Sequence, residues 1–169
     1  MATIIRRFSP ISVFTLSVML ILVCSGCVGS LINERWLPPS GNLNDTIITL
    51  ERTACYGKCP VYKLTVYGSG AVIYEGKDFV RTTGKAEETI SQEQIKQLVS
   101  EFEKANYYSL NDNYMEVAIT DLPYVNTSIA MDGKTKSIKH YCGDISAPEQ
   151  LTELENRIDE IVNTDQWVK

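Results

Sequence analysis

The fold of this chain depends on the stretch Arg52-Thr53-Ala54-Cys55-Tyr56-Gly57-Lys58-Cys59-Pro60-Val61-Tyr62, which holds two of the five cysteines. It lies between two β-rich runs, 46–52 and the run that starts at 61. Gly57 allows the chain to turn, and Pro60 fixes the backbone where the chain leaves the stretch. The stretch therefore predicts a constrained loop between two strands.

The residues after this loop predict further strands. Alternating apolar residues from 62 to 66, a Gly-Ser-Gly turn at 68–70 and the run 71–74 are typical of a β-hairpin. Gly76 predicts a bulge, residues 79–82 a continuing strand, and Gly84-Lys85 a turn before 87–90. The first half of the domain is therefore expected to be a set of antiparallel strands.

Two amphipathic helices are expected, each with a capping box at its start. Ser91 and Gln94 begin the first helix, and Ser146 and Glu149 the second, where Pro148 suits the first turn. Apolar residues recur at helical spacing in both helices: Ile95, Leu98, Val99, Phe102 and Ala105 in the first, and Leu151, Leu154, Ile158 and Ile161 in the second.

A second hairpin is predicted between the two helices. Residues 124–131 and 134–141 flank Asp132-Gly133, a strong type I′ turn signal. This register sets Val125 opposite His140 and so puts His140 on the apolar face. The irregular segment 106–123 before the hairpin is long enough to suggest a functional loop. The whole pattern predicts an α+β fold, with an antiparallel sheet of hairpins and both helices packed on one face.

Residues 1–27 are expected to form a lipoprotein-type signal peptide. Arg6 and Arg7 precede an almost uninterrupted apolar run, as in an export signal. The run ends in Leu22-Val23-Cys24-Ser25-Gly26-Cys27, which resembles the lipobox of bacterial lipoproteins and predicts lipidation of Cys27. The alternative is an uncleaved membrane anchor, since about 20 mostly apolar residues span a bilayer. Either way, the chain is expected to be exported and anchored to the membrane of a bacterial cell envelope.

Residues 28–45 are rich in Asn, Pro, Gly and Ser and predict a flexible tether, so that 46–169 remain for a single domain. The leader carries two of the 16 basic residues and none of the 21 acidic ones. This leaves 14 basic against 21 acidic residues, a formal net charge of −7 for residues 28–169. A domain of this charge is not expected to bind nucleic acid.

Three interpretations of Cys55 and Cys59 stay open. In an oxidising envelope they would form a disulfide, which pins the loop and contributes about 2 kcal/mol on the chain-entropy model. As thiolates, and with the imidazole of His140, they would suit Cu(I) or Zn(II), so that copper is the alternative cofactor. Beside Arg52 and Lys58 they could also carry out thiol-disulfide exchange.

The chain resembles an uncharacterised exported bacterial family, the domain of unknown function 6438, over about 46–169. The motifs that carry this resemblance are Arg52-x-x-Cys55-Tyr56-Gly57-x-Cys59-Pro60-x-Tyr62, Gly70-x-Val72-x-Tyr74-x-Gly76, Thr120-Asp121-Leu122-Pro123, and Glu153-Leu154-Glu155-x-x-Ile158-Asp159 with Trp167. The resemblance implies no activity. It does imply that the cysteine loop and the Asp-Leu-Pro turn belong to the pattern of the family, in which Cys142 has no place.

The expected function is a non-enzymatic binding or interaction module for an envelope protein or ligand. No catalytic constellation is visible in the sequence. The expected binding loop comprises Arg52, Tyr56, Gly57, Pro60, Tyr62 and Asp121, around the disulfide. The acidic residues of the second helix are expected to form a solvated face: Glu153, Glu155, Asp159 and Glu160.

Overall fold

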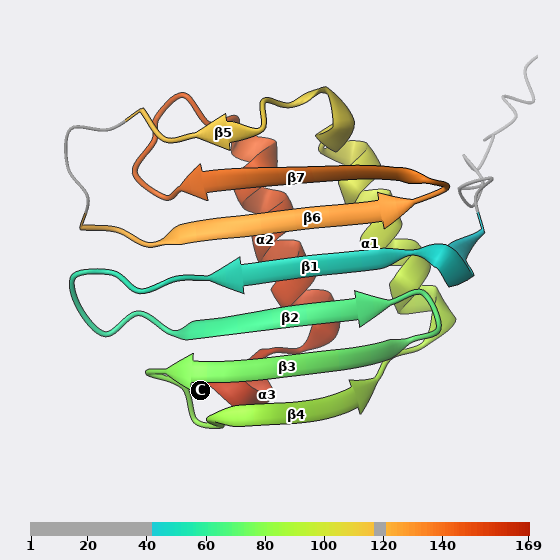
Figure 1. The fold of residues 1–169 in the computed structure, drawn as a ribbon, viewed down its shortest axis with the longest axis horizontal. Coiled ribbons are helices and arrows are strands. Elements are labelled where there is room, and N and C mark those ends of the chain that lie inside the picture. The colour runs from blue at the N-terminus through green and yellow to red at the C-terminus, as the bar shows by residue number, and fades with distance from the viewer. Residues whose placement is uncertain (1–41, 117–120) are drawn as a thin grey trace, which may run out of the picture. The chain divides into compact units, whose positions relative to one another are not determined.

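The computed structural model describes residues 42–116 and 121–169 (Figure 1). The signal peptide with Cys27, the tether residues 28–41 and Thr120 lie outside this part, so the lipoprotein interpretation stays a prediction. None of the helices in the described part is long and apolar enough to cross a membrane.

The described chain folds into one seven-stranded sheet with two main helices. The strands are β1 (Ile47–Arg52), β2 (Val61–Tyr67), β3 (Ala71–Asp78), β4 (Gly84–Thr89), β5 (Asn113–Tyr114), β6 (Tyr124–Met131) and β7 (Lys134–Tyr141). The helices are α1 (Gln92–Lys104) and α2 (Glu149–Val162), with short turns η1 (Leu43–Asp45), η2 (Tyr107–Ser109) and α3 (Asp165–Val168). The predicted α+β class is confirmed.

The strand order is β4-β3-β2-β1-β6-β7-β5, so β1 lies at the centre, between β2 and β6. Burial alternates along the central strands, as expected when only one face of a sheet is covered. Ile48 and Leu50 of β1 are buried, and Thr49 and Glu51 are partly exposed. One hydrophobic cluster joins the buried side chains of the sheet to those of α1 and α2.

The second hairpin has the predicted register. Val125 lies opposite His140, and Met131 opposite Lys134. Asp132 and Gly133 have φ angles of +51° and +72°, as a type I′ turn requires at both central positions. A strong local turn signal was therefore sufficient to set this part of the sheet.

The prediction was right for the start of the first helix and wrong for that of the second. Ser91 and Gln94 form the expected capping box at α1. At α2 the N-cap is Pro148, with no side-chain cap. Ser146 instead donates its hydroxyl to Asp144 Oδ1 at 2.7 Å. The loop before α2 thus holds the serine that was expected to cap the helix.

Three further predictions need correction. Residues 79–82 are not a strand, because Phe79 adopts a positive φ of +50° and the chain turns there before β4 begins. Gly84 and Lys85 are not a turn, because they are the first two residues of β4 and pair with β3. The sheet is also not wholly antiparallel, since β5, inside the segment expected to be irregular, pairs in parallel with β7.

The bulge predicted near Gly76 is confirmed. The β2–β3 register shifts between Tyr62, which lies opposite Gly76, and Val61, which lies opposite Asp78.

Gly68 attaches the start of the domain to the sheet. A Cβ at this position would lie 1.6 Å from the carbonyl oxygen of Leu43 in η1. The Gly68 N–H also donates to the Thr46 carbonyl at 2.7 Å. Only glycine allows this close approach, so the last residues of the expected tether, Leu43–Asp45, pack on the β2–β3 turn.

Candidate functional site

The loops that follow β1, β3, β5 and β7 lie at one end of the sheet, which we call the loop end (Figure 1). They meet there because β1, β3 and β7 run in the same direction and β5 is parallel to β7. The described residues of the loop end are 53–60, 79–83, 115–116, 121–123 and 142–148. The cysteine loop is thus one of four loops on a shared surface.

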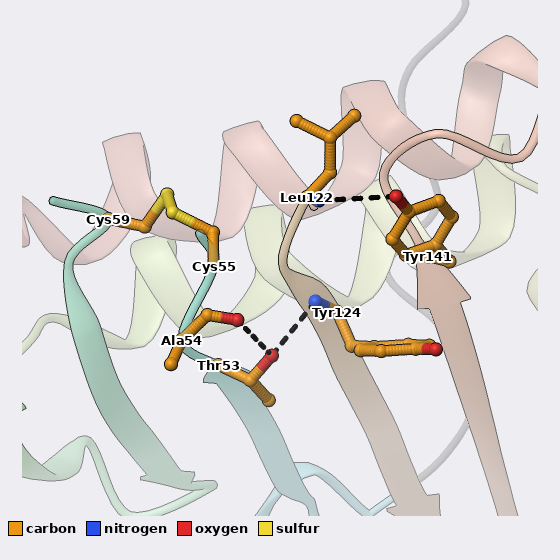
Figure 2. Close-up of a disulfide and its surroundings, with 7 residues drawn as sticks. All are labelled: Thr53, Ala54, Cys55, Cys59, Leu122, Tyr124 and Tyr141. Atoms are coloured by element: carbon orange, nitrogen blue, oxygen red, sulfur yellow. Dashed lines mark hydrogen bonds between the residues drawn. A yellow bond between two sulfur atoms is a disulfide. The ribbon is translucent and has the colours of Figure 1, made fainter. Parts of the chain in front are cut away.

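Cys55 and Cys59 form a disulfide, with their Cα atoms 5.8 Å apart (Figure 2). This is the first of the three interpretations of the pair. Gly57 and Lys58 lie exposed between the two cysteines, and Pro60 directly precedes β2. The cross-link therefore closes a short loop at the point where the chain passes from one central strand to the next.

Hydrogen bonds fix the cysteine loop to the segment that precedes β6. The Tyr56 N–H donates to the Asp121 carbonyl at 2.9 Å, and the Thr53 N–H donates to the Tyr124 carbonyl at 3.0 Å. The Tyr124 N–H donates in return to Thr53 Oγ1 at 2.9 Å (Figure 2). Asp121 therefore holds the cysteine loop through its backbone.

The segment before β6 is fixed in turn to the end of β7. Leu122 donates its N–H to the hydroxyl of Tyr141 at 3.2 Å (Figure 2). The Cys142 N–H donates to the Pro123 carbonyl at 3.1 Å. The carboxylate of Asp144 accepts the Glu116 N–H at 2.7 Å. Three of the four loops are therefore braced against one another.

Large apolar side chains are exposed mainly at the loop end. Seven are exposed in the described part of the chain, and five of them lie in these loops: Tyr56, Phe79, Met115, Leu122 and Ile145. Tyr56, between the two cysteines, is 90% exposed, and Ile145 is fully exposed. All five lie at the same end of the sheet, and exposed large apolar side chains are candidates for an interaction site.

Arg52 and Tyr62, both expected in the binding loop, contact α2. Arg52 Nη2 lies 2.7 Å from Asp159 Oδ2, and the Tyr62 hydroxyl donates to Asp159 Oδ1 at 2.7 Å. Burial and the Asp159 carboxylate raise the pKa of Tyr62. Burial opposes the charge of Arg52, but Asp159 and Tyr62 outweigh it and raise the pKa of the guanidinium. The three side chains join the base of the cysteine loop to α2.

His140 lies on the buried face, as predicted, and pairs with Glu155 of α2. His140 Nδ1 is 2.9 Å from Glu155 Oε1, and Glu155 is only 2% exposed. Burial raises the pKa of the Glu155 carboxyl, against the opposing effects of His140 and Arg52. The expected solvated face of α2 was therefore wrong for Glu155, which is buried, and for Asp159, which is largely covered.

Cys142 is a free, exposed cysteine at the loop end. Partial burial of its sulfur and the charge of Glu155 raise the pKa of the thiol, so its thiolate is disfavoured. Among residues 42–116 and 121–169, no group of three or more His, Cys, Asp or Glu side chains is placed to hold a metal ion. The residues of the metal interpretation are engaged in the disulfide and, for His140, in the contact with Glu155.

The position of Glu155 in the sequence indicates that its side chain is buried. The buried residues of α2 recur at 151, 154, 155, 158, 161 and 162, so Glu155 falls on the apolar stripe at helical spacing. A carboxylate on such a stripe needs a partner in the core, and the sequence has one histidine. Phe79, Met115, Leu122 and Ile145 had no such signal, because only the sheet order brings their loops together.

Comparison with known proteins identifies the pattern but no activity. The family model described as "Domain of unknown function (DUF6438)" matches residues 46–162. The match covers the whole sheet, α1 and α2, and it ends before α3. No curated protein matches the chain.

Proposed function

Because the chain belongs to the DUF6438 family, a domain of unknown function, we propose its function from the loop end. The chain is a non-enzymatic, lipid-anchored module of the bacterial cell envelope that binds a partner protein through this surface. The observation that carries the proposal is that five of the seven exposed large apolar side chains of the described residues lie in these loops, with Tyr56 between the two bonded cysteines.

The contacts that restrain the loops support a role of the loop end in binding a partner. The disulfide and the Tyr56–Asp121 hydrogen bond restrict the loop before any partner arrives, which lowers the entropy lost on association. Tyrosine contributes a large contact area with few rotatable bonds. The partner would therefore present an apolar surface that receives Tyr56 and Leu122.

The place where the chain enters the domain suits an anchored module. η1 lies at the end of the sheet opposite the loop end, since β1 runs from η1 toward the cysteine loop (Figure 1). A lipid on Cys27, followed by a tether, would thus hold the domain by the end remote from its binding surface. An uncleaved N-terminal anchor would enter the domain at the same place, so either form of anchor leaves the loop end free for a partner.

The two-layer arrangement belongs to the same proposal. Figure 1 draws α1 and α2 behind the sheet, and their buried side chains share one cluster with the buried residues of the strands. Both helices would then cover one face and leave the other to solvent. In this arrangement α2 contacts the strands that lead to the loop end, through Glu155 with His140 of β7 and through Asp159 with Arg52 of β1.

The proposal can be tested by photo-crosslinking in intact cells. A photoreactive phenylalanine analogue placed at Tyr56 should give a discrete adduct with one envelope protein. The same analogue at Ser69, exposed in the β2–β3 turn at the opposite end, is the matched control and should give none. The adduct at Tyr56 should weaken when Cys55 and Cys59 are both changed to serine, because the loop then loses its restraint.

The folded state of the serine variant is checked by circular dichroism and thermal unfolding. Equal adducts from Tyr56 and Ser69, or none from Tyr56 in a cell that makes the full chain, would overturn partner binding at the loop end. An adduct that persists unchanged without the disulfide would leave the surface in place but remove the role of the cross-link.

A further inference from the structure

One long edge of the sheet has no partner within the described part of the chain. The sheet ends at β5, of two residues, and at β4, of six, and only β3 pairs with β4 (Figure 1). The register between β3 and β4 runs without interruption from Gly84 to Thr89. The Thr89 N–H already donates to Glu88 Oε1 at 3.0 Å. An edge strand without proline or bulge presents its remaining N–H and C=O groups to another strand.

The charged side chains of β4 favour pairing with a strand that places opposite charges across from them. Lys85 and Glu87 lie on the same face, on either side of Ala86, with Lys85 Nζ 2.6 Å from Glu87 Oε1. Both side chains are more than half exposed. In an antiparallel pair, residues directly opposite each other project from the same face, and opposite charges in such positions stabilise the pair.

Pairing of β4 with a second β4 is complementary in one register. With a two-fold axis at Ala86, each Lys85 lies opposite the Glu87 of the other copy, which gives two favourable pairs. An axis at Lys85 or Glu87 would set identical charges opposite each other. An axis between two residues would oppose side chains that project from different faces, which the pleat does not allow.

We infer that β4 is a docking site for the β4 strand of a second copy of this chain. The result is a two-fold dimer in which the sheet continues from one protomer to the other. Because the two strands are antiparallel, the loop ends of the protomers face in opposite directions. The inference is argued from the edge strand alone and uses no residue of the loop end.

The dimer is expected to exchange with monomer. Two paired six-residue edges bury less than the roughly 1,200 Å² of a stable interface. The test therefore captures the dimer covalently in the full-length chain.

Ala86→Cys is the direct test, made in a Cys142→Ser background to remove the exposed free thiol. Opposed residues of antiparallel strands have Cα atoms about 4.5–5.5 Å apart, within the range of a disulfide. Glu88→Cys is the matched control, because its two copies would be offset by four residues, about 13 Å. Mild oxidation should give about tenfold more covalent dimer from Ala86→Cys than from Glu88→Cys.

Charge reversal distinguishes pairing in this register from non-specific association of the β4 edges. Adding Lys85→Glu to the Ala86→Cys chain sets glutamates opposite each other and should lower the dimer yield about tenfold. The further change Glu87→Lys restores opposite charges and should restore the yield. Equal yields from Ala86→Cys and Glu88→Cys, or no effect of Lys85→Glu, would overturn the inference. Since Lys85 and Glu87 are exposed, these changes should leave the thermal unfolding of the monomer unaltered.

Discussion

Replacing His140 by alanine will lower the free energy of unfolding by about 1–3 kcal/mol, the cost of leaving a buried polar group without its hydrogen-bond partner. His140 is 4% exposed and Glu155 2% exposed, so the carboxyl would stay in the core without its partner. The measurement is urea unfolding followed by circular dichroism, in which the midpoint should fall at an unchanged slope.

The double variant His140→Leu with Glu155→Leu is the control. Replacing both members of a buried pair by apolar residues is often close to neutral. We therefore expect the double variant to be more stable than His140→Ala, with strong non-additivity between the two positions. If His140→Ala unfolds at the wild-type midpoint, the pair does not hold β7 to α2.

The same pair should give the wild type a characteristic pH dependence. Burial raises the pKa of Glu155 in the folded state above its ordinary value of 4.5, so the folded chain binds this proton more tightly than the unfolded chain. The stability that this group contributes is present below the unfolded pKa and is lost as the pH rises through the folded pKa. Relative to Glu155→Gln, the wild type should therefore lose stability as the pH rises from 4.5.

Replacing Trp167 by alanine should cost about 3–5 kcal/mol of unfolding free energy. The indole of Trp167 is 7% exposed and stacks on Tyr74 of β3, with ring centroids 4.8 Å apart. Its carbonyl accepts the Thr82 N–H at 2.9 Å and so supports the turn that leads into β4. Trp167 lies beyond the residues that match the family, yet it covers the β3 side of the core.

Lys169→Ala is the matched control for Trp167→Ala. Lys169 lies two residues further on and is exposed, and its ion pair with Asp165 at the chain end is expected to contribute little. Thermal and urea unfolding of the two variants should therefore separate clearly. A loss below about 1 kcal/mol for Trp167→Ala would show that α3 is not part of the folded unit.

Local signals allowed much of the fold to be predicted from the sequence. The Asp132-Gly133 turn set the register of β6 and β7, because a two-residue turn allows only one pairing of the strands on either side of it. Ser91 and Gln94 marked the start of α1 for a similar reason, since a capping box needs only residues three apart. The cysteine loop was placed between β1 and β2 by its immediate neighbours.

The missing parts depend on contacts between distant residues. Arg52 and Asp159 are 107 positions apart, and only the placement of α2 under β1 and β2 brings them together. β5 pairs with β7 across 26 positions, so two residues of an apparent loop become a strand. Phe79 turns the chain where its sequence favours a strand, and the same turn is held by a distant residue, since the Thr82 N–H donates to the Trp167 carbonyl.

The same reason limits how much of the candidate site could be predicted. The disulfide loop with Tyr56 was found because its motif is continuous in the sequence. The apolar side chains of Phe79, Met115, Leu122 and Ile145 come from three other loops, and the order of the strands gathers them. Arg52 and Tyr62 were assigned to the binding loop from their place in the motif, and their contacts with Asp159 of α2 could not be predicted from it.

The measurement that tests the central claim most directly is a count of free thiols by mass spectrometry after alkylation of the folded chain from 28 to 169. This chain has three cysteines: Cys55, Cys59 and Cys142. A disulfide-pinned loop predicts one label before reduction, at Cys142, and three labels after it. Three labels before reduction, with stoichiometric Cu(I) binding that Cys59→Ser abolishes, would contradict the pinned loop and make this a metal-handling protein.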